Sequence, residues 1–474
     1  MSSLLASIAS SGDALRVFQR ALGVIQNNVD NASTPGYATQ QAALTALPLD
    51  IAGGLAGGVA MRSVETSRNE FADEEVRRQL QRLGQYSAQS QNLDSVENLF
   101  DVTGNSGVPA DLTKLFQAFS AWSANPGDPS VRQAVLDSAD AIADSVRSLS
   151  HSLADQASGL DSQVVSTIQQ INTLAGEVQK YNVQRLENQT PDPGADATLH
   201  ANLESLSQLT NITSLIQADG TVTVLAGGSA PLVIGNHQFS LSSSVSVDST
   251  PAPANPKSRG TARVLDWQGN EITGDIASGQ LGGILDVRNR VLASISGDAR
   301  QPGLLNRFAK TLADSVNQTL QAGMVSSASG AAAGSALFSY DTSDATLSAG
   351  SLKVTSIGPQ ELAPVDSTGT SNGNAIQLAS LANTTQAALG GLSLTGFLSQ
   401  IAANAGQESQ TAKTNTTAQQ QTAAQARSVR DQISGVSLDA EAIKLIEFQR
   451  GYQAAARVLA VLSDLTDKTI QMIP

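Results

Sequence analysis

The stretch that decides the fold is NNVDNASTPGY, which runs from Asn27 to Tyr37. It ends one residue pattern abruptly and begins an extended, glycine-rich one. Asn tolerates the left-handed backbone region, Pro fixes φ, and Gly adopts positive φ freely. We therefore expect an elaborate turn here, built by Asn27, Asn28, Asn31, Thr34, Pro35, Gly36 and Tyr37.

Before this turn, residues 3–30 predict one amphipathic helix. Apolar residues recur in steps of three and four, with one gap at Ser11. A stripe this narrow cannot bury itself on a lone helix, so it needs a partner helix. The stripe consists of Leu4, Ile8, Leu15, Phe18, Leu22, Ile25 and Val29.

The other end of the chain carries a matching pattern. A helix is predicted to start after Ser437 as its N-cap, with Asp439 and Glu441 in the first turn. Its apolar stripe, in steps near 3.5, includes Leu438, Leu445, Phe448, Tyr452, Leu459 and Leu462. We expect the two terminal helices to pair as a coiled coil and to pack against other molecules.

A very long helix lies between the two ends. It is predicted to start after Asp128, with Pro129 at the first helical position, and its apolar residues continue to Tyr181. Their period stays near 3.5, and at ~1.5 Å per residue the helix would be roughly 80 Å long. Further helices are expected over 64–100, 112–122, 284–295 and 304–320. The nearly uncharged 405–433 segment is predicted to be a helix packed on this rod.

These elements predict a mainly α fold with β-rich insertions. The terminal helices would pair at one pole, a helical bundle would form the rod, and small outer β domains would lie at the other pole. We assign 1–60 and 434–474 to the terminal segment, and 61–200, 280–325 and 376–433 to the rod. Residues 201–279 and 326–375 are assigned to the β-rich outer part, and residues 38–60 should be extended.

Composition excludes several classes of function. Lys and Arg number 28 against 42 Asp and Glu, a net charge of −14, which argues against nucleic-acid and anionic-membrane partners. The absence of cysteine excludes disulfides and thiolate metal sites. No apolar run is long enough for a membrane span, and Asp13 and Arg16 interrupt any signal-peptide core. Export would need a route without signal cleavage.

No catalytic or metal-binding motif is visible. The three histidines, His151, His200 and His237, are scattered without ligand-spaced partners, and no HExxH, GxSxG or P-loop pattern occurs. We therefore predict no enzyme activity, no cofactor and no metal.

The Asn27–Tyr37 turn resembles the signature of the flagellar rod, hook and hook-associated axial proteins, which reads NNxANxxTxGY. Asp30 departs from it, where the family usually has Ala. The C-terminal GVSLDAEAIKLIEFQRGYQAAARVLAVLSDL is similar to the closing helix of that family. Ala440 stands where a second acid is common, and the match is carried by Ser437, Leu438, Asp439, Glu441, Phe448, Gln449, Tyr452, Gln453, Ala454, Ala456 and Arg457.

Within that family, the long helix, DGTVTVLAGGSAPLVIG and GGILDVRNRVL are most similar to the proteins of the hook–filament junction. The resemblance implies a structural adaptor that joins hook to filament as a ring of identical subunits. Its implied partners are its own copies, the hook protein, the next hook-associated junction protein and an export chaperone. It further implies type III export and an extracellular location, with termini that are disordered in the monomer and helical after assembly.

Two alternatives stay open. A hook or distal-rod axial protein would share the same ends, but the long helical pattern argues against it because those relatives are richer in β structure. A secreted enzyme or adhesin with axial-protein-like ends would need a polar catalytic cluster within 203–390, and no such cluster stands out in the sequence.

Overall fold

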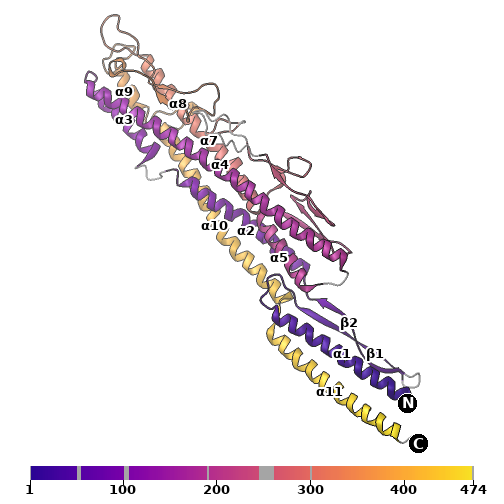
Figure 1. Cartoon of the computed structure of the whole chain (residues 1–474). Helices are drawn as coiled ribbons and strands as arrows, with labels where there is room; N and C mark the ends of the chain where they lie inside the picture. Colours follow the sequence, from indigo (N-terminus) through magenta and orange to yellow (C-terminus); the bar gives the residue numbers. More distant parts are fainter. Residues whose placement is uncertain are drawn as a thin grey trace.

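The computed structural model describes residues 2–50, 55–100, 106–188, 192–244, 261–298 and 301–471. The chain forms a long rod that continues into a thinner segment, with both termini at the same pole (Figure 1). The helices are α1 (Ser2–Asp30), α2 (Glu70–Glu97), α3 (Gly107–Ala124), α4 (Pro129–Glu187), α5 (Pro193–Leu209), α6 (Gly279–Asp286), α7 (Ala293–Ser296), α8 (Leu304–Gln321), α9 (Gly373–Ser380), α10 (Leu394–Ser434) and α11 (Leu438–Gln471).

Shorter elements connect these helices. A π-helical segment, η2 (Val287–Leu292), joins α6 to α7, and single 3₁₀ turns form η1 (Thr273–Asp275), η3 (Pro359–Glu361) and η4 (Ala387–Leu389). The strands are β1 (Gln40–Asp50), β2 (Leu55–Thr66), β3 (Ile212–Ile216), β4 (Val222–Ala226), β5 (Ala230–Ile234), β6 (His237–Gln238), β7 (Ser242–Ser243), β8 (Val264–Leu265), β9 (Phe338–Ser339) and β10 (Lys353–Val354).

The helix α4 is the axis of the rod, and its predicted start is confirmed. The Asp128 carboxylate accepts the Ser130 N–H at 2.8 Å, and Pro129 occupies the first turn. Buried residues then recur at helical spacing along 59 residues and join one continuous core with α2, α3, α5, α6, α8 and α10. Burial of this stripe against neighbouring helices accounts for a helix far longer than a globular domain needs.

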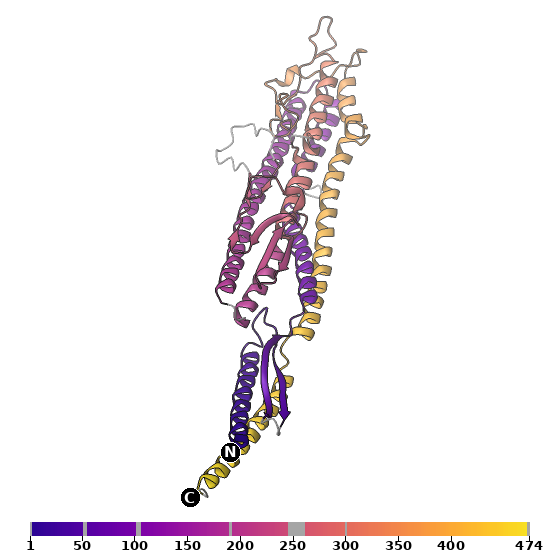
Figure 2. The same ribbon diagram turned by 90° about the vertical axis from the view of Figure 1, so that its right-hand side faces the viewer.

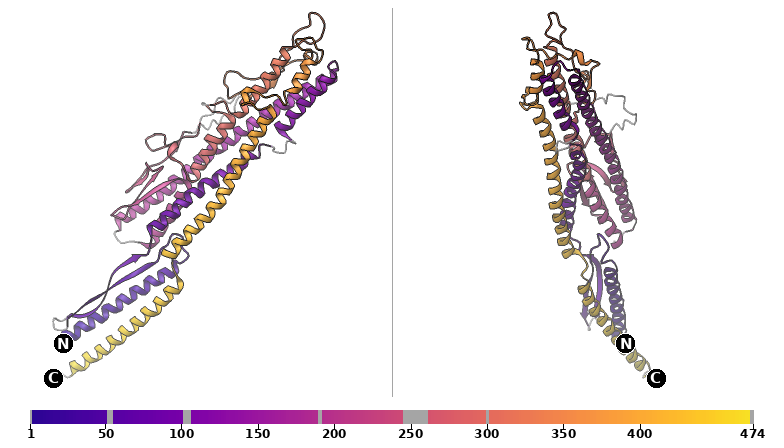
Figure 3. Two further views of the ribbon diagram at one scale, coloured as in Figure 1. Left: turned by 180° about the vertical axis from the view of Figure 1, so that it is seen from behind. Right: turned by 90° about the vertical axis from the view of Figure 1, so that its left-hand side faces the viewer.

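The predicted packing of residues 405–433 on the rod is also confirmed. The helix α10 runs antiparallel to α2 along the rod (Figure 3). The Gln419 side-chain amide donates to the Gln79 side chain at 2.6 Å and to the Gln79 carbonyl at 3.1 Å. The predicted start of a helix at residue 64 is wrong, because Asn69 caps α2 by accepting the Ala72 N–H at 3.0 Å.

Residues 38–60 are extended as expected where the structure describes them. The strands β1 and β2 form an antiparallel hairpin that pairs Gln40 with Thr66, so it continues past residue 60. The hairpin packs along α1, where the Ser10 hydroxyl donates to the Gly57 carbonyl at 2.6 Å (Figure 2). The three-part division of the chain stays a prediction.

The main sheet does not lie where the sequence pattern suggested. The strands β3, β4, β5 and β6 form an antiparallel sheet in that order. The Asn182 side chain holds it to α4, since its amide donates to the carbonyls of Val222 and Gly235 at 2.8 and 2.7 Å. Because Asn182 lies near the C-terminal end of α4, the sheet flanks the half of the rod nearest the terminal segment. A β domain at the opposite pole is therefore wrong.

At the opposite pole, loops and turns lie beside the ends of α3, α4, α8 and α9 (Figure 1). Arg132, at the start of α4, donates to the carbonyls of Pro359 and Leu362, which places the 326–375 segment at this pole. Within the described residues, the only strands of that segment are the two-residue β9 and β10. Aspartates at 341, 344 and 366 accept the N–H two residues later and form turns instead of strands. The expected β-rich character of 326–375 is therefore wrong.

Within the part of the chain that the structure describes, no helix has both the length and the hydropathy required for a transmembrane segment.

Candidate assembly interface

The two terminal helices pack antiparallel. The Phe18 and Phe448 ring centroids lie 6.3 Å apart, and the Gln19 side-chain amide donates to the Tyr452 hydroxyl at 3.3 Å. At the other end of the contact, Asn28 meets Glu441, so α1 and α11 run in opposite directions. The chain ends therefore come together although they are more than 400 residues apart in sequence.

The predicted apolar stripe of α1 lies at this contact, but the most buried residues of the helix are mostly one position before the predicted ones. Ile25 is buried, Val29 is exposed, and the other members, Leu4, Ile8, Leu15, Phe18 and Leu22, are half-buried. The sequence pattern missed Val17 and Ala21, which are buried. The displacement arises because α1 has two partners, α11 on one side and the β1–β2 hairpin on the other.

The predicted stripe of α11 faces α1, but it is covered only in part. Leu445, Phe448, Tyr452, Leu459 and Leu462 are half-buried. Leu438, predicted in the same stripe, is 56% exposed. Ser437 caps the helix, as predicted, through a 3.4 Å bond from the Ala440 N–H. Among the described residues of α11, only Glu441 is fully buried.

A second apolar face of α11 is left exposed by the residues that the structure describes. We call it the outward face, and it consists of Ile443, Ile446, Val458, Val461 and Leu465, all of them exposed. Their spacing places them on the side of the helix nearly opposite the stripe that meets α1. Apolar residues gathered on one exposed helix face mark an interaction surface.

A buried polar cluster joins the two sequence motifs, and we call it the polar lock: Asn28, Tyr37, Gln40 and Glu441. The Asn28 amide donates to the Gln40 carbonyl at 2.8 Å and to the Glu441 carboxylate at 2.9 Å. The Asn28 side-chain oxygen accepts the Gln40 N–H and the Tyr37 hydroxyl, each at 2.9 Å. Asn28 has no exposed surface, so all four bonds form away from water.

Glu441 has two roles in this arrangement. It lies in the first turn of α11, where a carboxylate is favoured, as the sequence indicated. It is also 1% exposed and completes its pairing with Lys444 at 2.8 Å. Burial, and then the nearby Glu441 charge, raise the pKa of the Tyr37 hydroxyl above its usual value. The lock was not predicted, because a helix-start acid and a turn asparagine carry no signal that they meet.

The rest of the turn is held by its own side chains. The Asn31 amide donates to the Asn27 carbonyl at 2.9 Å, and the Thr34 hydroxyl donates to the Asn31 side chain at 3.1 Å. Pro35 is exposed. Gly36 has φ +76°, and a Cβ there would lie 2.4 Å from the Ala197 carbonyl oxygen. The turn therefore fits against α5 only with glycine at this position.

One arginine connects the turn to the rod, and we call this contact the joint. The Arg68 guanidinium, with only 6% of its side chain exposed, donates to the Gly36 carbonyl at 2.6 Å. It also pairs with Asp73 of α2 at 3.0 Å and with Asp196 of α5 at 2.9 Å. Residue Thr39 adds bonds to the Ser434 and Gly435 carbonyls at the end of α10. No pattern in the sequence marked Arg68.

The histidines differ in their surroundings. His151 and His237 are exposed, whereas His200 of α5 is buried beside the joint. Its two ring nitrogens lie 3.6 Å from Asp73 and 3.7 Å from Asp196. Burial lowers the pKa of His200 well below its usual value, and the charges of Arg68, Arg77 and Arg430 lower it further. Asp196 lies one helical turn before His200, a spacing visible in the sequence, whereas the approach of Asp73 from α2 is a result of the fold.

Comparison with known proteins agrees with this architecture. A family profile described as the flagellar hook-associated protein FlgK helical domain matches residues 93–338. A second, described as the flagellar basal body rod FlgEFG protein C-terminal, matches residues 428–472 and so covers α11 and the polar lock's Glu441. The flagellar hook junction protein FlgK from Burkholderia pseudomallei has a similar fold, with a TM-score of 0.62 at 14% identity over 76% of this chain and 100% of that one.

Two curated relatives extend the comparison. Flagellar hook-associated protein 1 of Bacillus subtilis (strain 168) is 25% identical over 99% of this chain and 98% of its own length. The protein of the same name from Salmonella typhimurium is 26% identical over 62% of this chain, a match that spans about half of that relative. Since the helical-domain profile alone matches more than half of the residues, the chain belongs to the flagellar hook-associated protein FlgK family.

Proposed function

We propose that this protein is a structural adaptor of the bacterial flagellum that joins the hook to the filament as a ring of identical subunits. The names of its relatives, hook-associated protein 1 and hook junction protein, support this role. The hook protein would lie below the ring and the next hook-associated junction protein above it. We propose a mechanical role without catalysis.

One observation carries the proposal: the outward face of α11. It leaves five apolar side chains in water, including Ile443 at 67% and Val461 at 60% exposure. The inner side of α11 already meets α1, so no described part of the single chain covers the outward face. A ring of copies supplies that cover, because each subunit brings the same helix to a neighbour.

The free energy gained by burying the outward face is large enough to favour assembly. Full burial of a Val, Leu or Ile side chain contributes ~1.5–3 kcal/mol, and these side chains are half covered already. Five of them would therefore contribute about 5 kcal/mol per subunit. That gain adds to the other contacts that offset the entropy of ordering an end which, by itself, buries little apolar surface.

Because the terminal segments bury little apolar surface in the single chain, they are also suited to export in an unfolded state. We propose that the terminal segments, 1–60 and 434–474, are disordered before assembly, are protected by an export chaperone, and leave the cell without signal cleavage. Residues 61–200, 280–325 and 376–433 would form the rod, and 201–279 and 326–375 its outer parts. The assembled protein would then be extracellular.

A charge on the outward face tests the proposal. Val461→Asp should leave the rod folded, by circular dichroism and thermal melting, yet fail to restore filaments to cells that lack the gene. Electron microscopy should then show bare hooks, with flagellin shed into the medium. The matched control is Ala460→Asp, on the adjacent exposed position outside this face. Normal filaments with Val461→Asp would contradict the proposal.

A further inference from the structure

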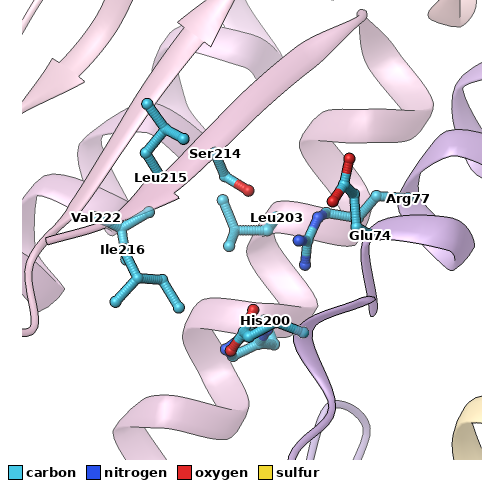
Figure 4. Close-up of a pocket in the computed structure, with 9 residues that line it drawn as sticks. Glu74, Arg77, His200, Leu203, Ser214, Leu215, Ile216 and Val222 are labelled. Atoms are coloured by element: carbon cyan, nitrogen blue, oxygen red, sulfur yellow. The ribbon is translucent and has the colours of Figure 1, made fainter. Parts of the chain in front are cut away.

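A small cavity lies beside the joint, between α2, α5 and the first strands of the main sheet. Its volume is about 170 Å³. Figure 4 shows His200 and Leu203 between Arg77 and Glu74 on one side and apolar residues of the sheet on the other. The lining consists of Glu70, Glu74, Arg77, His200, Leu203, Ser214, Leu215, Ile216 and Val222.

Two polar side chains of this region, His200 and Glu70, make no hydrogen bond that would occupy them within the described residues. His200 is 3% exposed, and its Nδ1 atom makes no hydrogen bond among the residues that the structure describes. This is costly for a buried polar atom, and such atoms are rare in folded proteins. The Glu70 carboxylate, at the start of α2, likewise has no hydrogen bond or ion pair of its own within the described ranges.

We propose that His200, Asp73 and Glu70 form a binding site for a divalent transition-metal ion such as Zn²⁺. A nitrogen of His200 and one carboxylate oxygen from each acid all lie within 4.8 Å of one another. In a tetrahedral site with ~2.1 Å bonds, neighbouring ligand atoms are roughly 3.4 Å apart. Glu70 is exposed, so rotation of its side chain can close most of this difference.

The donor set decides the class of ion. One imidazole nitrogen and two carboxylates suit zinc and similar borderline ions, whereas calcium and magnesium prefer oxygen ligands alone. The cavity next to His200 leaves room for a water molecule as the fourth ligand.

The surrounding arginines are compatible with such a site, because most of them are already paired. Arg68 is shared between Asp73 and Asp196, and Arg430 pairs with Glu204. A carboxylate has about four lone-pair positions, so Asp73 can bind an ion while it accepts from Arg68. Hydrogen bonds of this kind orient the ligand. Arg77 lines the cavity itself, and its charge would oppose the ion.

An ion here would connect two helices at a mechanically important place. Glu70 and Asp73 belong to the first turn of α2, and His200 belongs to α5. Asp73 also pairs with Arg68, whose guanidinium donates to the Gly36 carbonyl of the turn. A bound ion would therefore stiffen the part of the rod that carries the terminal segment.

The test uses the purified full-length chain, Zn²⁺ and isothermal titration calorimetry in a buffer that does not chelate metals. The wild type should bind one Zn²⁺ per chain, and Zn²⁺ should raise its melting temperature. Glu70→Gln should weaken binding at least about tenfold, as should His200→Gln. Since Glu70 is exposed, the first variant retains the fold.

Two matched variants control for binding elsewhere. Glu187→Gln, at an exposed glutamate at the end of α4, and His151→Gln, at an exposed histidine, should bind Zn²⁺ as the wild type does. The proposal is overturned if the wild type shows no saturable site, or if Glu70→Gln binds with unchanged affinity. Either result leaves the assembly proposal untouched, because that proposal rests on α11.

Discussion

Replacement of Asn28 by alanine removes the centre of the polar lock. The side chain makes four hydrogen bonds, two as donor and two as acceptor, all between 2.8 and 2.9 Å. It is fully buried, so water cannot take its place without a change in packing. The variant would leave the Gln40 N–H and carbonyl, and part of the Glu441 carboxylate, without their partner.

The size of the effect follows from these bonds. Each buried group left unsatisfied costs about 1–3 kcal/mol, and the Tyr37 hydroxyl and Glu441 retain other partners. The two Gln40 groups therefore dominate, and we expect a loss of roughly 3 kcal/mol in the association of α1 with α11. That corresponds to about a hundredfold change in an equilibrium constant.

The assay is filament attachment in cells that lack the gene and carry the variant on a plasmid, scored by electron microscopy and by flagellin in the medium. Asn28→Ala should give mostly bare hooks, while Gln26→Ala, an exposed position two residues earlier, should behave as wild type. Asn28→Asp should also fail, because it places a carboxylate against Glu441. Combination with Glu441→Gln should restore part of the activity. If the effects of Asn28→Asp and Glu441→Gln on filament attachment were simply additive, the proposed contact between these two side chains would be refuted.

Three further perturbations test neighbouring features. Gly451→Val should cost about 1–3 kcal/mol of helix pairing and reduce filament attachment, because a Cβ there would lie 3.0 Å from the Phe18 ring. Gly36→Ala should open the joint and speed tryptic cleavage after Arg68, because its Cβ would clash with the α5 backbone. The raised pKa of Tyr37 means that the neutral phenol stabilises the lock below pH ~10 and that this contribution disappears as pH rises through the folded-state pKa, so isolated filaments should detach in alkali.

Each of these has a control. Gly23→Ala and Gly12→Ala, where a Cβ meets no atom within 4 Å, should retain attachment and tryptic resistance. Tyr37→Phe should start from weaker attachment but show no further loss specific to the phenol above pH 10. Equal alkaline loss in Tyr37→Phe and wild type would show that other groups cause the detachment.

Helical periodicity revealed most of the fold. The long helix α4 and both terminal helices could be predicted because each buries a narrow stripe at regular spacing, which leaves a trace in the sequence. The turn was visible because Asn, Pro and Gly have distinct backbone preferences. The position of the main sheet was not visible, since it depends on contacts between residues far apart in sequence, such as those of Asn182 and Gln179 with the sheet backbone.

The polar contacts of the site could not be predicted, for a physical reason. Asn28 meets Glu441, and Arg68 meets Asp196, across more than 100 residues of sequence in each case. Polar residues follow no period when they are buried singly, so no pattern distinguishes them from surface residues. Leu438 and Val29 show the opposite error. Both fit the apolar period and were predicted to be covered, but both are exposed at the end of the contact between α1 and α11.

The most direct test of the central claim is the accessibility of the outward face before and after assembly. The chain has no cysteine, so Val461→Cys introduces a single thiol. A maleimide should label it rapidly in the free chain, at the rate of the exposed rod variant Ser166→Cys, and should fail to label it in intact hook–filament junctions. Equal labelling of Val461→Cys in the free and assembled states would contradict the claim that copies of this chain cover α11.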